Sequence, residues 1–398
     1  MQSVVLAAGE GTRMRPLTAR RPKPMLPVGD KPLVAHTVDA AVEAGASRIV
    51  LVVGYEADAV RKHFGDEYGG VPVEYAVQER QEGTADAVRA ARDQLDDAPF
   101  VVLNGDDLYD AESLSDLYEA APAVGTYEVE DPRPYGVFDV VDGVVTDIVE
   151  KPDDPPSNMV NVGAYAFPAA AQRWLDVTES ERGEYELTDV LAHVIDEYEV
   201  SAVDVSFWMG VGRPWELLEA NEWALGDLTQ RIDGDVHADA DLRGPVVVEE
   251  GATIDAGVVI EGPVLVREGA TVGPNAYVRG HTAVGLDAKI GASVEVKNSV
   301  LMADASVPHL SYVGDSVLGR DVNFGAGTTV ANLRHDDENV RVRVKGEAVD
   351  TGRRKFGVVA GDGAKTGIDT SLNAGVKLGA EAKTAPGEVV TRDRDTEY

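Results

Sequence analysis

Ser3-Val4-Val5-Leu6-Ala7-Ala8-Gly9-Glu10-Gly11-Thr12-Arg13-Met14 is the stretch that decides how the first half of the chain folds. Its apolar run predicts a buried strand, and small residues follow at once. Glycines let a backbone approach a phosphate closely and point N–H groups at it. We therefore expect a phosphate group to bind beside Gly9 and Gly11 at the end of this strand, with the positive charge of Arg13 just beyond.

A second segment, Arg21-Pro22-Lys23-Pro24-Met25-Leu26-Pro27, places Lys23 between two prolines. Proline restricts its own backbone and that of the preceding residue, so Lys23 is expected on a stiff segment. The two segments together resemble the signature of the sugar-1-phosphate nucleotidylyltransferases. The dinucleotide-binding pattern is not matched, because Met14 stands where a third glycine would be. The resemblance implies catalytic roles for Arg13 and Lys23, with UTP or dTTP and a sugar-1-phosphate as substrates. It also implies that Leu6, Ala7, Ala8 and Gly9 bind the nucleotide.

Strand-like and helix-like segments alternate after this loop. Strands are predicted at 48–54 and 71–77 and in a run that starts at Phe100, and helices at 31–45 and 56–64. This alternation predicts an α/β fold with a doubly wound, Rossmann-like parallel sheet. Ligands of such sheets bind beyond the carboxyl ends of the strands.

Two motifs follow predicted strand ends in this region. Gln78 could pair with a base edge, and Gly83 and Thr84 offer backbone groups at a helix start, although a polar loop with a capping threonine has the same sequence. The resemblance implies that this segment binds the pyrimidine. It also matches Asp106, in Asn104-Gly105-Asp106, to the magnesium-binding aspartate, and Mg²⁺ typically takes one or two carboxylates plus phosphate oxygens.

A third group of motifs lies further along the chain, in Pro134-Tyr135-Gly136, Glu150-Lys151-Pro152 and Asn161-Val162-Gly163. The resemblance implies that Gly136, Glu150, Lys151 and Asn161 bind the sugar-1-phosphate. Taken singly, each could be an ordinary surface residue.

One position departs from the family pattern. The family has a second metal-binding Asp or Asn within Trp-x-Asp-x-Gly, whereas this chain has Trp208-Met209-Gly210-Val211-Gly212. Glycine offers no ligand, and Asp204 or a water remain alternatives for that role. A helix is predicted from Pro214 to Leu228.

The sequence after Asp233 changes to a hexapeptide repeat. Its apolar positions are Val248, Ile254, Ile260, Val266, Val272, Val278, Val284, Ile290 and Val296. Such a period predicts a parallel β-helix with inward residues stacked coil on coil. The phase slips after about Val300 and resumes near Leu318, and an insertion interrupts it at 332–355. The predicted domains are 1–229 and 230–398.

His309 lies in the phase slip, where it is displaced from the inward stack. A neutral imidazole can take a proton from an amine that attacks a thioester, and a phenol such as Tyr312 could support the oxyanion. This half resembles the left-handed β-helix acetyltransferase domain of bifunctional glucosamine-1-phosphate acetyltransferases/N-acetylglucosamine-1-phosphate uridylyltransferases, especially the archaeal-type branch. The resemblance implies His309 as catalytic base, and further residues that bind sugar phosphate (Arg279, Lys297, Tyr312 and Asn323) or acetyl-CoA (Ala326 and Asn332).

Two questions stay open at the sequence level. Arg341, Arg343 and Lys345 on the insertion could bind CoA phosphates or simply form a charged loop. The chain could also be a glucose-1-phosphate thymidylyl- or uridylyltransferase with a structural or regulatory β-helix. A bifunctional enzyme of the resembled family would acetylate glucosamine- or galactosamine-1-phosphate, whereas this alternative enzyme would not.

Composition limits the partners. The net charge of −34 would be repelled by nucleic acid and by anionic membranes, and it resembles adaptation to a high-salt cytoplasm. No apolar run of about 18 residues and no signal-peptide pattern is found, so a cytoplasmic protein is expected. The chain has no cysteine, which excludes disulfides and thiolate metal sites. Left-handed β-helices usually trimerise, so a homotrimer or a dimer of trimers is expected.

Overall fold

The computed structural model describes residues 1–180 and 182–395, and the chain separates into two compact units. The first comprises Met1–Glu10, Pro22–Met25 and Pro32–Gly210. The second comprises Gly11–Arg21, Leu26–Lys31 and Val211–Tyr398. Two short N-terminal segments therefore group with the C-terminal half of the chain.

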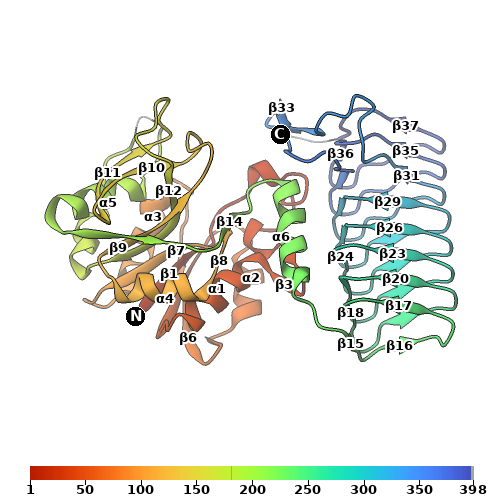
Figure 1. Ribbon diagram of the computed structural model, residues 1–398, viewed down its shortest axis with the longest axis horizontal. Coiled ribbons are helices and arrows are strands. Elements are labelled where there is room, and N and C mark those ends of the chain that lie inside the picture. The colour runs from red at the N-terminus through yellow and green to blue at the C-terminus, as the bar shows by residue number, and fades with distance from the viewer. Residues whose placement is uncertain (181, 396–398) are drawn as a thin grey trace. The chain divides into compact units, whose positions relative to one another are not determined.

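A ten-stranded sheet forms the centre of the first unit (Figure 1). Its order is β10-β11-β13-β9-β12-β7-β1-β4-β6-β5. The strands are β1 (Gln2–Leu6), β4 (Arg48–Val53), β5 (Glu67–Tyr68), β6 (Val71–Val77), β7 (Phe100–Asn104), β9 (Ala123–Glu128), β10 (Gly136–Val141), β11 (Val144–Glu150), β12 (Met159–Phe167) and β13 (Val200–Asp204). A separate pair joins β8 (Asp107–Tyr109) to β14 (Trp208–Gly210).

Helices cover both faces of this sheet because side chains alternate along its buried strands. Val4 and Val50 pack in a core with α3 (Thr84–Ala90) and α5 (Leu187–Glu197). Val5 and Leu51 belong to a second core with α1 (Leu33–Glu43), α2 (Ala57–Phe64) and α4 (Ala111–Glu119). The remaining short elements are η1 (Thr12–Met14), η2 (Lys23–Met25), β2 (Pro27–Val28), β3 (Lys31–Pro32), η3 (Arg92–Gln94) and η4 (Ala169–Trp174).

The sheet is Rossmann-like at its centre and mixed toward one edge. β7, β1, β4 and β6 run parallel, as the alternation predicted. β12 then pairs antiparallel with β7, and β10 with β11. Asp142-Gly143 joins β10 to β11 with positive φ at both residues, which is the geometry of a tight hairpin turn. This local signal, rather than the helix–strand alternation, marks the antiparallel part.

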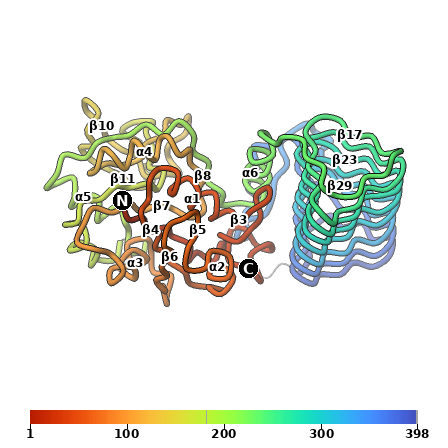
Figure 2. Tube along the Cα trace, turned by 90° about the horizontal axis from the view of Figure 1, so that it is seen from below, coloured from red at the N-terminus to blue at the C-terminus, as the bar shows by residue number. Residues whose placement is uncertain are grey.

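The second unit is a left-handed β-helix whose strands stack as successive rungs (Figure 1), with its coils following one another from green to blue in Figure 2. One sheet contains β15 (Arg231–Ile232), β18 (Val246–Val248), β21 (Val264–Val266), β24 (Thr282–Val284), β27 (Val300–Leu301), β30 (Val317–Leu318), β34 (Val359–Ala360) and β36 (Lys377–Leu378). A second contains β16 (Asp235–Val236), β19 (Thr253–Ile254), β22 (Thr271–Val272), β25 (Lys289–Ile290) and β28 (Ser306–Val307). The third contains β17 (Asp241–Arg243), β20 (Val259–Glu261), β23 (Tyr277–Arg279), β26 (Glu295–Lys297), β29 (Tyr312–Gly314), β31 (Thr329–Val330), β35 (Ser371–Leu372) and β37 (Val389–Val390).

The predicted repeat positions form the interior of these coils. Every apolar position from Val248 to Val296 named above belongs to one buried cluster. Val248 pairs with Val266, eighteen residues later, whereas Val284 pairs with Leu301, seventeen later. Shorter coils thus account for the phase slip that the sequence predicted.

The insertion leaves the coil as a hairpin of β32 (Arg341–Val344) and β33 (Glu347–Asp350), and the coil resumes where β30 pairs with β34. Helix α6 (Pro214–Gly226) precedes the first coil and starts with a proline in its first turn. None of the helices within the described residues is long and apolar enough to span a membrane.

Candidate functional site

The glycine-rich loop lies where parallel strands of the first unit end together. Leu6 pairs with Val52 of β4 and with Asn104 of β7, so the residues that follow β1 and β7 meet at one edge. Ala7 and Ala8 are buried, and Gly9 has open space where a side chain would begin. The carbonyl oxygen of Ala8 accepts a hydrogen bond from Gln81. The predicted residues Leu6 to Gly9 therefore line this edge.

Lys23 and Asp106 meet at the same edge. Lys23 belongs to η2 and is only 8% exposed, and its ammonium group forms an ion pair with the carboxylate of Asp106. Asp106 follows β7 directly and remains more accessible. A buried cation beside an accessible carboxylate suits a site that handles both phosphate and a metal ion. The structure thus brings together two residues that lie far apart in the sequence.

Asp107 is a site residue that sequence reasoning did not assign. It is buried, and its Oδ2 accepts a hydrogen bond of 3.1 Å from Asn104. Burial, and then the negative charge of Asp106, raise the pKa of the Asp107 carboxyl to about 7. Because β14 pairs with β8, Gly210 lies directly across from Asp107, and a Cβ on Gly210 would be 3.1 Å from its Oδ1. Asp204 instead accepts a hydrogen bond from Thr126.

These carboxylates fit a magnesium ion by the chemistry of their donors. Mg²⁺ prefers oxygen ligands and usually takes one or two carboxylates, leaving its other positions to water and substrate phosphates. Asp106 and Asp107 supply that number, and Gly210 keeps the space beside Asp107 clear of a side chain. No group of three or more metal-ligating side chains occurs in residues 1–180 and 182–395.

The predicted base-binding segment follows β6. Gln78 is buried, and its side-chain amide donates to Gly83 O at 3.1 Å and to Asp86 Oδ2 at 2.8 Å. Gly83 adopts φ +129°, and a Cβ there would lie 2.3 Å from the carbonyl oxygen of Tyr185. Thr84 begins α3 and accepts a hydrogen bond from the backbone of Leu187. A small polar cavity of about 280 Å³ lies beside Gln78.

The four residues predicted to bind sugar phosphate cluster in the first unit. Gly136 pairs with Glu150 across β10 and β11, and a Cβ on Gly136 would be 2.9 Å from Glu150 Oε2 and 3.5 Å from Asn161 Cβ. Lys151 lies 3.3 Å from Glu150 Oε1, and the side-chain amide of Asn161 donates to the Tyr165 hydroxyl at 2.6 Å. Arg13 belongs to the second unit, where it lies exposed in η1.

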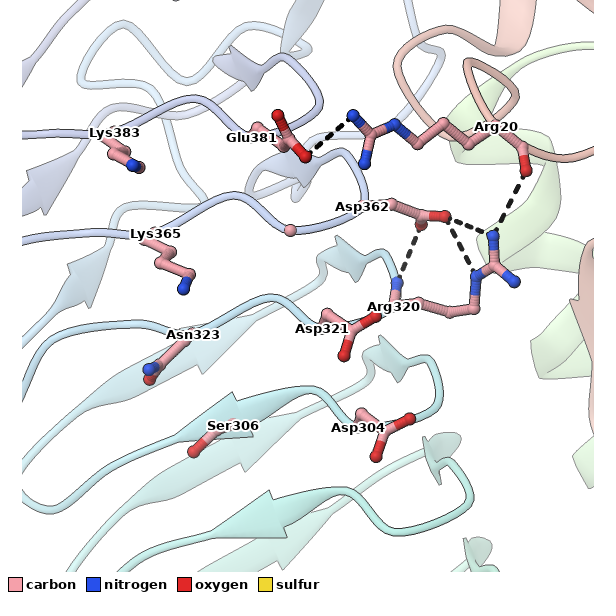
Figure 3. A pocket seen from close by; sticks show the side chains of 11 residues that line it. Arg20, Asp304, Ser306, Arg320, Asp321, Asn323, Asp362, Lys365, Glu381 and Lys383 are labelled. Atoms are coloured by element: carbon pink, nitrogen blue, oxygen red, sulfur yellow. Dashed lines mark hydrogen bonds and ion pairs between the residues drawn. The ribbon is translucent and has the colours of Figure 1, made fainter.

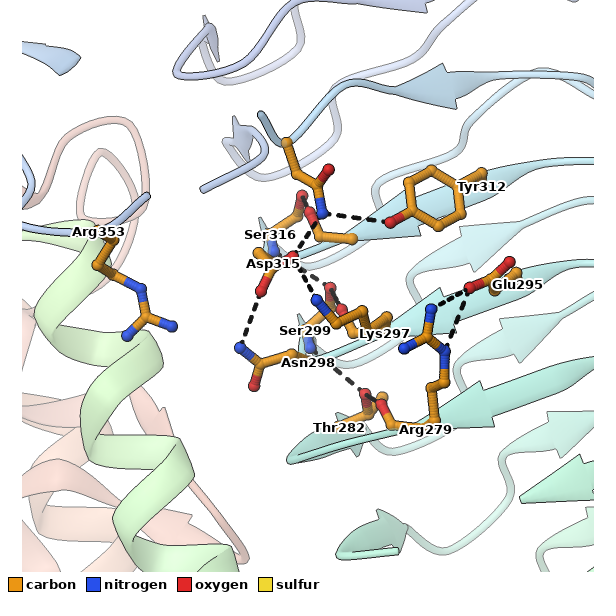
Figure 4. Close-up of polar contacts among 12 residues, drawn as sticks. Arg279, Thr282, Glu295, Lys297, Asn298, Ser299, Tyr312, Asp315, Ser316 and Arg353 are labelled. Atoms are coloured by element: carbon orange, nitrogen blue, oxygen red, sulfur yellow. Dashed lines mark hydrogen bonds and ion pairs between the residues drawn. The ribbon is translucent and has the colours of Figure 1, made fainter. Parts of the chain in front are cut away.

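A second polar cluster lies on the third sheet of the β-helix (Figure 4). Arg279 and Lys297 occupy paired positions on β23 and β26, so they stack one above the other. Arg279 donates to Glu295 at 2.7 Å, and Lys297 lies 3.2 Å from Asp315. The next position in this column is Gly314, where a Cβ would lie 2.4 Å from the Tyr312 hydroxyl. Glycine therefore leaves room for the phenol.

Asp315 connects the members of this cluster and was not predicted. It is 2% exposed and accepts hydrogen bonds from Lys297 Nζ, from Asn298 Nδ2 at 3.1 Å and from Asn332 Nδ2 at 2.5 Å. Asn332 also donates to the Tyr312 hydroxyl at 3.2 Å. Burial, and then the negative charge of Asp315, raise the pKa of Tyr312. Tyr312 thus keeps its proton well above neutral pH.

Helix α6 contacts this cluster through Glu222. Asn298 donates to Glu222 of α6 at 2.7 Å, and Glu222 is paired with Arg353, which follows the hairpin insertion. Arg353 also lies 3.4 Å from Glu219. These contacts join segments of the second unit that are distant in sequence, which is why no local pattern predicted them.

The remaining predicted acetyl-transfer residues lie at other places on the coils. His309 is exposed in the turn between β28 and β29, and its carbonyl accepts a hydrogen bond from Gly327. Leu310 beside it has φ +62° and is 69% exposed. Asn323 pairs with Ser306 and so extends the second sheet, not the third, while Ala326 follows it in the next corner. One chain therefore does not gather Asn323 with Tyr312.

Two family models match successive parts of the chain. Residues 2–225 match the family model described as nucleotidyl transferase, and residues 260–356 match that of the GMPPB C-terminal domain. A solved structure of UDP-glucose pyrophosphorylase complexed with UDP-glucose matches with a TM-score of 0.51 at 27% identity, covering 55% of this chain and 96% of that one. The fold and the first site thus define a nucleotidyltransferase.

Relatives match the whole chain. It is 40% identical to the bifunctional protein GlmU of Methanococcus vannielii, covering 100% of this chain and 96% of the relative. It is 39% identical to the bifunctional sugar-1-phosphate nucleotidylyltransferase/acetyltransferase of Sulfurisphaera tokodaii, covering 99% and 98%. The chain belongs to this family of bifunctional sugar-1-phosphate nucleotidylyltransferases/acetyltransferases.

Proposed function

We propose that the chain makes a nucleotide sugar in two steps. The β-helix, residues 230–398, transfers an acetyl group from acetyl-CoA to glucosamine-1-phosphate or galactosamine-1-phosphate. Residues 1–229 then join the sugar-1-phosphate to UTP or dTTP and release pyrophosphate. The observation that carries this proposal is the cluster of Lys297, Tyr312 and Asn332 around the buried Asp315, with Arg279 paired to Glu295 beside it. A purely structural coil has no need of a buried carboxylate that is paired in this way.

The nucleotidyl step needs charge neutralisation rather than a base. The sugar-phosphate oxygen that attacks the α-phosphorus is already ionised, so its bond to phosphorus forms as the bond to pyrophosphate breaks. Lys23 stabilises the charge on the triphosphate, and Lys151 holds the sugar phosphate. The catalytic role that the resemblance implies for Arg13, which belongs to the second unit, stays a prediction. Asp106 and Asp107 would hold Mg²⁺, which neutralises phosphate charge when bound.

The acetyl step needs a base. His309 takes a proton from the amine as its nitrogen bonds to the thioester carbon, and the carbon–sulfur bond then breaks to release CoA. Arg279 and Lys297 hold the sugar phosphate, and protonated Tyr312 orients the substrate. Asn323 and Ala326 would complete the site from a second copy in a homotrimer, since they extend a different sheet from Tyr312. Leu310, exposed beside His309, is an apolar contact for such a copy.

Two assays on one preparation test the proposal. Purified protein with acetyl-CoA and glucosamine-1-phosphate should release free CoA, and with UTP or dTTP and a sugar-1-phosphate it should release pyrophosphate. Pyrophosphate release without CoA release would favour a uridylyl- or thymidylyltransferase with a structural β-helix. Offering several sugar-1-phosphates with both nucleotides identifies the preferred pair. Because these substrates are cytoplasmic metabolites, we also propose a cytoplasmic location.

Replacing Lys23 separates the two activities. Lys23→Ala should reduce pyrophosphate release by roughly a hundredfold or more, since it removes a cation preorganised for the reacting phosphates. CoA release should stay at the wild-type rate. Lys62→Ala, an exposed lysine on α2, is the matched control and should change neither rate. An equal loss of both activities in Lys23→Ala would contradict two separate sites.

A further inference from the structure

A cavity of about 640 Å³ opens on the second unit at the end of the β-helix that carries the last coils (Figure 3). One end of it is lined by paired charges, in which Arg20 contacts Glu381 at 2.8 Å and Arg320 contacts Asp362 at 2.8 Å. Asp304 and Asp321 line the same corner. The other end is a column of polar side chains from successive coils.

This column continues the second sheet of the β-helix. Ser306 pairs with Asn323, Asn323 with Lys365, and Lys365 with Lys383. Neighbouring strands lie about 4.8 Å apart, so the two lysines sit on adjacent rungs and face the same side. Both are exposed, and within the described residues neither ammonium group has a carboxylate at ion-pair distance.

The two lysines differ from most arginines of the second unit. The protein carries a net charge of −34, and most arginines of the second unit are paired with a carboxylate. Like charges directly opposite each other across a strand pair destabilise a sheet. Two cations at this spacing are therefore better satisfied by a ligand with two adjacent negative charges, and a diphosphate has that form.

We propose that Lys365 and Lys383 bind the diphosphate of coenzyme A. The inference rests on the acetyl transfer proposed above. Asn323, which the resemblance assigns to that site, is the next rung of the same column, so the column leads from the acetyl site to the lysine pair.

The hairpin cations are a weaker choice for this role. Arg341 and Arg343 alternate with the buried Val342 and Val344, so they form the solvated face of β32. The side chain of Arg343 donates to the carbonyl of Gly346 within its own hairpin. The charged-loop interpretation of this insertion accounts for both arginines.

The double variant Lys365→Ala/Lys383→Ala tests the inference. We expect the KM for acetyl-CoA to rise roughly tenfold or more, because two charge-assisted contacts are lost. The KM for glucosamine-1-phosphate and the rate with acetyl-pantetheine, which lacks the diphosphate, should not change. Lys289→Ala is the matched control, since Lys289 is an exposed lysine of the same column that pairs with Ser306. It should leave every constant unchanged.

Calorimetric titration of the same variants with CoA, and separately with UTP, distinguishes the sources of the diphosphate. Weaker CoA binding with unchanged UTP binding supports the inference. Unchanged CoA binding, weaker UTP binding or an equal loss with acetyl-pantetheine would overturn it. If the wild-type protein neither binds CoA nor releases it from acetyl-CoA, the proposed acetyl transfer itself fails, which is a different result from wild-type activity that the lysine variant retains.

Discussion

A side chain at position 210 would begin 3.1 Å from Oδ1 of Asp107. The family pattern puts a carboxylate or amide at position 210, whereas here Gly210 lies across the strand pair from Asp107. We therefore propose that the Asp107 carboxylate of β8 replaces the metal ligand that the resemblance implies at position 210. The sequence predicted Asp106 from its motif, but it could not predict Asp107, because the pairing of β8 with β14 joins residues about a hundred positions apart.

Measurements of metal binding test whether Asp107 replaces a ligand at position 210. Asp107→Asn should weaken binding of Mn²⁺, a spectroscopic substitute for Mg²⁺, by roughly tenfold, since one charged oxygen ligand is lost. Adding Gly210→Asp to that variant should restore most of the affinity. The measurement is the electron paramagnetic resonance signal of unbound Mn²⁺ during titration in the presence of UTP.

Asp204→Asn is the control for this titration, because Asp204 is engaged with Thr126 and should not affect the metal. Thermal melts of each variant show whether it folds. If Asp107→Asn folds and binds Mn²⁺ like the wild type, Asp107 is not a ligand.

At the scale of elements, β29 and the turn after it organise the β-helix site. Gly314 admits the Tyr312 hydroxyl, and Asp315 holds the cation and the two amides that surround it. The repeat predicted the coils and their buried positions because inward residues recur at a fixed period. It could not predict Asp315 as the centre of a network, because Glu222 comes from α6 and Asn332 from the start of the insertion.

Replacing Asp315 should separate positioning from catalysis. In Asp315→Asn the charge that holds Lys297 is lost, and hydrogen bonds to a charged group are worth about 1.5–3 kcal/mol. We expect the KM for glucosamine-1-phosphate to rise roughly tenfold while kcat for acetyl transfer changes little. Steady-state kinetics measure both constants, and Asp287→Asn, an exposed corner carboxylate, is the control. A fall in kcat alone would contradict a positioning role.

At the scale of the whole molecule, we expect the net charge to make the stability of the fold depend on salt. The net charge is −34, so the excess carboxylates repel one another in the folded chain, and salt screens that repulsion. Composition alone predicts this behaviour, because it depends on the sum of charges and not on their arrangement.

Thermal unfolding at increasing KCl measures the effect. Because the Debye length falls to about 3 Å at 1 M salt, Tm should rise by roughly ten degrees or more between 0.1 and 2 M KCl. Sucrose at matched osmolality is the control, since it carries no charge. A Tm that is unchanged or falls with KCl would show that self-repulsion is not a large term in stability.

The N-terminal segment Gly11–Arg21 belongs to the β-helix unit although it continues the glycine-rich loop of the first sheet. Within that unit Arg21 contacts Met302 at 3.3 Å, and Arg20 contacts Glu381. Recombination at the end of α6 would therefore exchange the β-helix without the N-terminal segment that packs in the same unit. A chimera with the β-helix of another protein would also need the N-terminal segment of that protein that matches Gly11–Arg21. The two halves of the chain are therefore expected to evolve together.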